Sequence, residues 1–100
     1  MARLRTSPAA RADLHEIRRY SRASFGTIVA SEYLGGLSAA FDRIAARPLV
    51  GAAVERLAPD MRSLSYRSHR IYYRVDGDAV LVVRILHHAR DAPSTLEPET

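Results

Sequence analysis

The chain has 100 residues, of which 47% are hydrophobic, as expected for one globular domain rather than a disordered chain. It contains no cysteine, which excludes disulfides, thiolate metal sites and cysteine nucleophiles, and no apolar run of membrane-spanning length. The net charge is +4, and all 15 basic residues are arginines. The absence of lysine excludes a lysine Schiff base or proton shuttle, and the positive charge favours an acidic partner. The N-terminal MARLRTSP lacks the apolar core of a signal peptide, so a cytoplasmic location is expected.

The first half of the chain predicts a short strand followed by two helices. Residues 2–7 alternate in polarity, and Ser7 with Pro8 is typical of a capped helix start. Gly26 is expected to end this helix, and a second amphipathic helix runs on to the residues before Pro48. Two such helices joined by a tight turn form a helical hairpin.

Two adjacent glycines, Gly35 and Gly36, lie inside the second predicted helix. Each costs about 1 kcal/mol relative to alanine in a helix. This cost favours a close approach of another backbone, either that of the first helix or that of a partner, over a simple break in the helix.

The second half of the chain predicts a loop and three strands. Residues 47–60 contain three turn formers and are expected to form a loop. The strands are expected at 61–66, 69–75 and 79–88, with a hairpin turn at 76–78. The last strand is apolar on both alternating sets, which indicates a position inside the sheet. One set is Val80, Val82 and Leu86, and the other is Leu81, Val83 and Ile85.

These elements predict an α+β fold of order β-αα-βββ, with the helical hairpin packed on one face of a small, mostly antiparallel sheet. Alternation is expected to turn Ile71 and Tyr73 toward the helices and to leave Tyr72 exposed on the other face. That other face is expected to be a binding floor carrying arginines at alternating positions: Arg62, Arg70, Arg74 and Arg84. Residues 1–91 are expected to form the domain, with 92–100 as a flexible tail.

Two motifs, RIYYRV at 70–75 and RILHHARD at 84–91, resemble the ParE/RelE superfamily of toxins from bacterial toxin–antitoxin modules. SPAA followed by Asp13 and Leu14 is similar to the first helix of the family, and Arg47-Pro48 to its helix-to-sheet loop. RelE-like members cut messenger RNA in the ribosome with a set of basic residues, whereas ParE-like members lack that set and block DNA gyrase. The LHxxRD pattern and the absence of lysine resemble the ParE-like branch.

The resemblance implies the toxin component of a type II module, without catalytic machinery or a cofactor. It implies inhibition of DNA gyrase and neutralisation by a cognate antitoxin with a ribbon-helix-helix DNA-binding part. The toxin would then contact DNA only through the antitoxin, in a hetero-oligomeric complex away from any membrane. The alternatives are a ribosome-dependent mRNA endonuclease and a degenerate toxin kept for its antitoxin contacts.

The end of the last strand is the candidate target-binding site, because a rigid strand holds its terminal side chains in place. The residues are Arg84, His87, His88, Arg90 and Asp91. A ribonuclease would use a histidine as the base and arginines to clamp the phosphate. That alternative set is His87, His88, Arg70, Arg84 and Arg90.

Antitoxin binding is expected on the arginine stripe of the first helix and on the arginine face of the sheet. The residues are Arg11, Arg18, Arg22, Arg62, Arg74 and Tyr72. No metal site is expected, because neighbouring residues such as His87 and His88 point to opposite faces of a strand. The alternative for His87 is a packed ring that is hydrogen-bonded to backbone.

Overall fold

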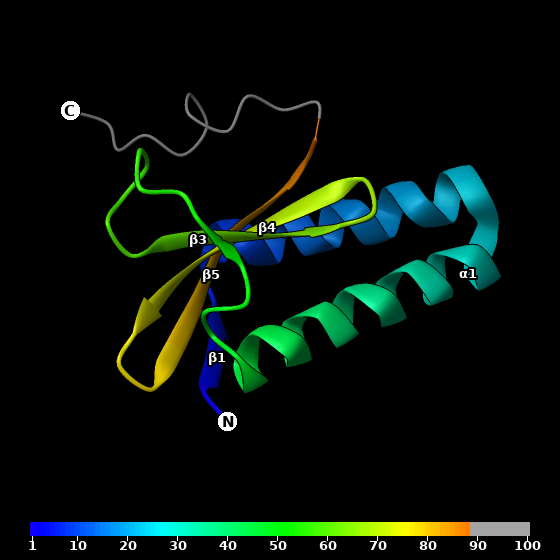
Figure 1. The fold of residues 1–100 in the computed structure, drawn as a ribbon. Helices are drawn as coiled ribbons and strands as arrows, with labels where there is room; N and C mark the ends of the chain where they lie inside the picture. The colour runs from blue at the N-terminus through cyan, green and yellow to red at the C-terminus, as the bar shows by residue number, and fades with distance from the viewer. Residues whose placement is uncertain (89–100) are drawn as a thin grey trace.

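The structure, a computed structural model, describes residues 1–88 (Figure 1). It is an α+β fold in which a helical hairpin packs on one face of a five-stranded sheet, as the sequence predicts. The elements in chain order are β1 (Arg3–Thr6), α1 (Pro8–Ala46), β2 (Ala52–Ala53), β3 (Met61–Tyr66), β4 (His69–Asp76) and β5 (Ala79–His87). The two-residue strand β2 lies in the segment that was expected to be entirely loop.

The helix α1 consists of two antiparallel segments because its backbone is interrupted at Gly26 (Figure 1). Gly26 has φ 83° and ψ 170°, a conformation that residues with a Cβ atom rarely adopt. At the N-terminus, the Ser7 side chain accepts a hydrogen bond from the Ala10 amide at 2.9 Å, and Pro8 occupies the first turn. The predicted cap and the predicted interruption are both confirmed.

The sheet has the strand order β1-β5-β4-β3-β2, so β5 lies inside the sheet as predicted. Its β1–β5 pair is parallel and the remaining pairs are antiparallel. The β4–β5 register shifts between Tyr72, which faces Arg84, and Tyr73, which faces Val82. Val83 is therefore the extra residue of a β-bulge, which reverses the alternation of every later side chain on β5.

The sheet has a hydrophobic core on each face. This corrects the predicted exposure of Tyr72 and the predicted grouping of Leu86 with Val80 and Val82. The first cluster, between the hairpin and the sheet, includes Leu37, Ile44, Ile71, Tyr73, Val80, Val82 and Ile85. The second, on the opposite face, contains Val54, Met61, Tyr72 and Leu86, with Leu57 and Ala58 packed against it. Ile71 and Tyr73 face the helices as predicted, but Tyr72 is only 3% exposed because the loop after β2 covers it. The bulge places Ile85, rather than Leu86, with Val80 and Val82.

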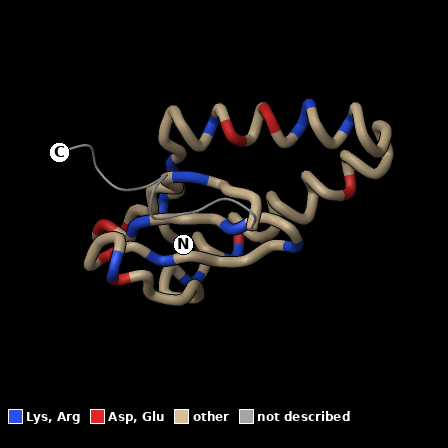
Figure 2. The backbone as a smooth tube through the Cα atoms, turned by 90° about the horizontal axis from the view of Figure 1, so that it is seen from above, with Lys and Arg blue, Asp and Glu red and all other residues tan. Residues whose placement is uncertain are grey.

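The outer face of the sheet is not a bare arginine floor, because three of its four arginines have intramolecular partners. Arginines lie on the strands of the sheet as well as along α1 (Figure 2). Arg62 donates to the Gly51 carbonyl oxygen at 2.7 Å. Arg74 forms a two-point pair with Asp60, with both N–O distances at 3.0 Å. Arg84 pairs with an aspartate of α1, and Arg70 is exposed. Most arginines of the predicted binding face therefore attach loops or α1 to the sheet.

A close contact between α1 and β3 explains the glycine pair. A Cβ atom at Gly36 would overlap the Tyr66 hydroxyl and lie 2.7 Å from Cζ of that ring, whereas Gly35 has no such neighbour. The Tyr66 hydroxyl donates to the Tyr33 carbonyl oxygen at 3.0 Å. The group that approaches the helix is thus a tyrosine side chain of the sheet, rather than the backbone of the first helical segment.

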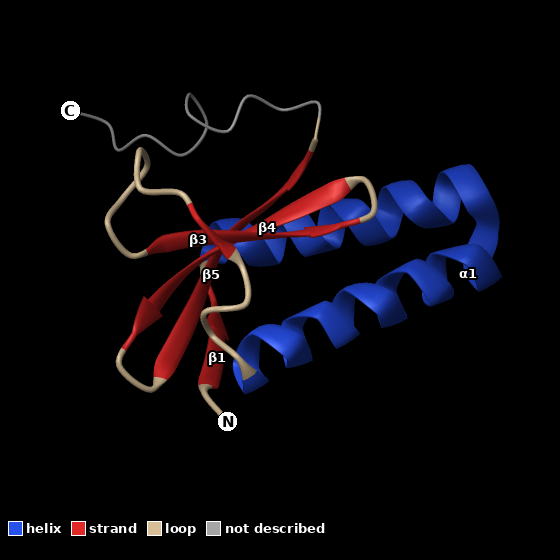
Figure 3. Ribbon diagram, viewed as in Figure 1, coloured by secondary structure: helices blue, strands red, loops and turns tan. Residues whose placement is uncertain are grey.

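The hairpin is longer than the sheet that it covers. Figure 3 shows the turn between the two segments of α1 extending past the β3–β4 turn. Large apolar side chains near this turn are exposed: Tyr20, Phe25, Ile28 and Val29. Within residues 1–88, no helix is both long and apolar enough to cross a membrane.

Candidate functional site

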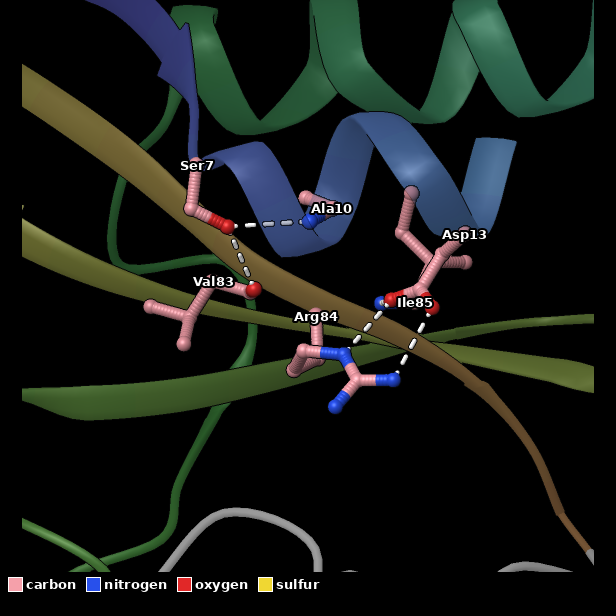
Figure 4. Close-up of polar contacts among 6 residues, drawn as sticks. All are labelled: Ser7, Ala10, Asp13, Val83, Arg84 and Ile85. Carbon is pink, nitrogen blue, oxygen red and sulfur yellow. Dashed lines mark hydrogen bonds and ion pairs between the residues drawn. The ribbon is translucent and has the colours of Figure 1, made fainter. Parts of the chain in front are cut away.

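The first segment of α1 is fastened to the second half of β5 by side chains (Figure 4). Asp13 accepts hydrogen bonds from Arg84 Nε at 2.8 Å and Nη2 at 2.9 Å, and from the Ile85 amide at 2.9 Å. The Ser7 hydroxyl donates to the Val83 carbonyl oxygen at 2.7 Å. Since β1 pairs with β5 only as far as Val82, these groups replace the missing strand partner. Val83, Arg84 and Ile85 of β5 are therefore held against the start of α1.

Arg84 is a link within the fold rather than a free cation. Its side chain is 21% exposed and that of Asp13 is 15% exposed. The hydrogen bonds from Asp13 raise the pKa of the Arg84 guanidinium above its usual value, although burial opposes this change. Of the other residues expected at the strand end, His87 and His88 are exposed, and Arg90 and Asp91 lie outside the described residues.

A groove of about 740 Å³ lies between the overhanging hairpin and the end of the sheet. We call it the hairpin groove. It is lined by Asp13, Glu16, Ile17, Tyr20, Ser21, Phe25, Val29 and Tyr33 of α1, by Arg67, Ser68 and His69, and by Ile85, Leu86 and His87. Tyr20 is 65% exposed and Phe25 is 59% exposed, and their rings pack edge to face at 6.2 Å. Exposed aromatic side chains gathered around a groove are typical of a protein-binding surface.

Two histidines, His69 and His87, line one end of the hairpin groove, and His88 contacts His69 beside it. We call His69, His87 and His88 the histidine corner. The Tyr33 hydroxyl and His69 Nδ1 share a hydrogen bond of 2.5 Å. The His69 and His87 rings pack edge to face with centroids 5.4 Å apart, and His88 Nε2 lies 3.1 Å from the His69 carbonyl oxygen. Burial lowers the pKa of His69 below its usual value, and His87 and His88 lower it further, while Asp13 opposes them. The neutral form of His69 is therefore favoured.

His69 and Tyr33 were not among the residues that the sequence indicated. They lie on β4 and α1, 36 residues apart, and no local spacing connects them. Their contact follows from the turn at Gly26, which brings the second segment of α1 back over the β3–β4 turn. Only the tertiary arrangement assembles this end of the groove.

Within residues 1–88, the candidate ribonuclease residues do not share one cavity, and Arg90 lies outside the described part of the chain. Arg70 lines a separate cavity of about 460 Å³ together with Tyr72 and the β2 segment. His87 lines the hairpin groove, and the Arg84 charge is taken up by Asp13. Among residues 1–88, no three His, Cys, Asp or Glu side chains lie close enough to hold a metal ion.

The arginines expected to bind the antitoxin divide into two groups. Arg62 and Arg74 are tied to Gly51 and Asp60 on the sheet. On α1, Arg11 donates to the Thr6 carbonyl oxygen at 2.7 Å, and Arg18 and Arg22 are exposed. The arginines of the first helical segment, which Figure 2 shows spaced along α1, are thus the more accessible group.

Residues 4–92 match the model of a protein family described as ParE toxin of type II toxin-antitoxin system, parDE. The chain is 42% identical to Toxin ParE1 of Mycobacterium tuberculosis over 91 residues, which cover 90% of this chain and 93% of that protein. It is 36% identical to Toxin ParE1 of Caulobacter vibrioides over 92 residues, covering 92% and 95% of the two chains.

Solved structures of toxin–antitoxin complexes have the same fold. A chain of the chromosomal ParDE system from P. aeruginosa superposes with a TM-score of 0.73, at 22% identity, covering 87% of this chain and 96% of that one. A chain of the RelBE2 complex from Mycobacterium tuberculosis superposes with a TM-score of 0.63, at 26% identity, covering 89% and 93%. The family match over nearly the whole chain and the two ParE1 relatives place this protein in the ParE toxin family of type II toxin–antitoxin systems.

Proposed function

We propose that this toxin inhibits DNA gyrase by protein–protein contact, in the cytoplasm and without a catalytic step of its own. The observation that carries the proposal is the state of Arg84, whose charge is taken up by Asp13. An RNA-cleaving site needs cations aimed at the phosphate, but the Arg84 guanidinium is held by Asp13 and Arg70 lines a different cavity from His87. An exposed, rigidly held strand end suits recognition of a protein surface better than phosphate chemistry.

The proposed target surface is the end of β5 with the residues that follow it. His87 and His88 are exposed there, and Arg90 and Asp91 follow outside the described residues. Arg84 would act on this surface as a positioning residue, because it fixes the strand end to α1 through Asp13. Arg90→Ala is expected to reduce growth inhibition while leaving folding and antitoxin binding nearly unchanged.

The proposed antitoxin surface is the hairpin groove with the arginines of the first helical segment. An antitoxin segment would cover Tyr20, Phe25 and Val29 and place its carboxylates near the outer arginines, Arg11, Arg18 and Arg22. Tyr72 is not part of this surface because the loop after β2 covers it. The antitoxin would carry the ribbon-helix-helix part, so the toxin would reach DNA through its partner in a hetero-oligomeric complex.

The target is tested by two assays on the same purified toxin. If the proposal holds, the toxin inhibits gyrase supercoiling and accumulates cleaved DNA, while in vitro translation continues. Ribosome-dependent cleavage of messenger RNA with unaffected gyrase would instead support the endonuclease alternative. Inactivity in both assays, with antitoxin binding retained, would indicate a degenerate toxin.

The antitoxin surface is tested by thermal melting with and without the cognate antitoxin. Covering the apolar groove should raise the melting temperature of the toxin. Bound antitoxin adds about 2.7 kcal/mol to the free energy of unfolding when its concentration is 100 times its dissociation constant. Tyr20→Ala should weaken this effect, and Leu49→Ala is the matched control, because Leu49 is 66% exposed but does not line the groove. An unchanged melting temperature with antitoxin would contradict the proposal.

A further inference from the structure

Within residues 1–88, the carboxylates of α1 that line the hairpin groove are already paired with arginines. His69 faces Tyr33 and Asp13 of α1, His87 of β5 and His88 directly after it, and the turn residues Arg67 and Ser68. Asp13, whose charge acts on the pKa of His69, already accepts three hydrogen bonds from Arg84 and the Ile85 amide. Glu16, on the rim of the groove, is paired with Arg19 at 3.7 Å. The groove therefore has an apolar body and a histidine-lined end, and the carboxylates of α1 beside it are engaged with Arg84 and Arg19.

Arg67 adds a fixed positive charge to this end. It occupies the β3–β4 turn with φ 50°, and its guanidinium carbon lies 5.8 Å from the centroid of the Tyr66 ring. No carboxylate within residues 1–88 pairs with it within 4 Å. A negatively charged group entering the groove beside His69 would meet both the histidines and Arg67.

We propose that the histidine corner receives a carboxylate of the antitoxin segment that fills the hairpin groove, and that the corner takes up a proton when this carboxylate arrives. This proposal rests on the proposed function, since it names the chemistry of the antitoxin at the same groove. The occupant is an amphipathic segment with apolar side chains for Phe25 and Val29 and an aspartate or glutamate for His69. The complex therefore tightens as the pH falls from 8 to 6.

The hydrogen bonds at the corner accommodate both protonation states of His69. When the ring is neutral, the Tyr33 hydroxyl can donate to Nδ1. When the ring is charged, Nδ1 donates to the hydroxyl oxygen, and the hydroxyl proton can turn to Ser68 Oγ, which lies 3.2 Å away. A carboxylate beside the ring favours the charged form, whereas the empty groove favours the neutral form. Proton uptake thus requires no rearrangement of the backbone.

The magnitude of the effect follows from proton linkage. Each proton taken up on binding strengthens the complex by at most about tenfold per pH unit, in the range between the pKa values of the free and bound states. Histidine is the side chain whose charge changes between about pH 5 and pH 8. We expect the dissociation constant to fall by about tenfold or more between pH 8 and pH 6, with most of the change attributable to His69.

The test is isothermal titration calorimetry of the full toxin with its purified cognate antitoxin. Titrations at pH 7 in phosphate and in Tris, which differ in ionisation enthalpy, count the protons taken up on binding. Uptake of a measurable fraction of a proton is expected for the wild type, and His69→Gln should abolish most of it. His15→Gln is the matched control, because His15 is exposed on α1 and does not line the groove. It should leave the proton count unchanged.

Imidazole proton NMR titration of wild-type toxin, free and in the complex, gives a second measurement that does not depend on the folding of a variant. The His69 signal should titrate at a higher pH in the complex than in the free protein. Tight binding without proton uptake, or uptake that survives in both His69→Gln and His87→Gln, would overturn this inference while the antitoxin surface stands. A failed gyrase assay would instead overturn the proposed function and leave the proton count unaffected.

Discussion

Replacing Asp13 by asparagine should strongly destabilise the fold, because this carboxylate joins α1 to the half of β5 that β1 does not reach. Asparagine has nearly the same size but presents N–H groups to the guanidinium donors of Arg84. Three hydrogen bonds, of 2.8 to 2.9 Å, are weakened or lost. The change also leaves the Arg84 charge without its carboxylate in a site where its side chain is only 21% exposed.

The cost of this change can be bounded from the burial of the pair. Removing one partner of a fully buried ion pair costs about 3–5 kcal/mol. Asp13 and Arg84 retain some exposure, and asparagine keeps one acceptor oxygen, so we expect a loss of about 2–4 kcal/mol in the free energy of unfolding. For a domain of this size, about 4–8 °C of melting temperature is lost per kcal/mol, so the midpoint should fall by roughly 8–32 °C.

The matched control is Asp60→Asn, which removes the same two-point aspartate–arginine geometry from an exposed place. The Asp60 and Arg74 side chains are 38% and 49% exposed, and their N–O distances are both 3.0 Å. Exposed pairs contribute little to stability because water screens them. Urea unfolding followed by circular dichroism measures both variants. Equal losses for Asp13→Asn and Asp60→Asn, or a loss below about 1 kcal/mol for Asp13→Asn, would refute the argument from burial.

Three further predictions test the packing and the titration of the fold. Gly36→Ala should lower the free energy of unfolding by about 1–3 kcal/mol, because its Cβ atom would overlap the Tyr66 hydroxyl. Gly35→Ala has open space and should stabilise α1 by up to about 1 kcal/mol. Thermal melting compares the two variants, and equal effects would contradict the packing. Tyr73→Phe should lower the free energy of unfolding by about 1–3 kcal/mol, because the hydroxyl donates to the Pro48 carbonyl oxygen at 2.7 Å and accepts from the Gly51 amide at 2.9 Å. An unchanged urea midpoint would show that these two hydrogen bonds do not stabilise the fold. Burial lowers the pKa of His69 below 6.5, so the unfolded chain binds the proton more tightly, and the free toxin should lose stability as the pH falls below about 6.5. Urea midpoints between pH 8 and pH 5 measure this loss, which His69→Gln should reduce and His15→Gln should not.

Features that depend on residues close together in the sequence could be predicted from it. Ser7 and Pro8 specify the helix start through a cap and a fixed φ, and Gly26 marks the break because only a residue without Cβ adopts its conformation easily. The apolar run of β5 indicated an inner strand, and the order of the motifs indicated the toxin family. These properties are local, or they are repeated along the chain, and the sequence alone therefore determined them.

The environment of each candidate functional residue was decided by the tertiary structure. The bulge at Val83 reversed the alternation that strict strand periodicity predicts, and the loop after β2 buried Tyr72 on the face expected to be open. Arg84 meets Asp13 across 71 residues of sequence, and His69 meets Tyr33 across 36. Whether an arginine is a free cation or a buried link depends on which side chain packs beside it. The packing of the helical hairpin on the sheet determines that neighbour. This packing cannot be read from residue types and their spacing along the chain.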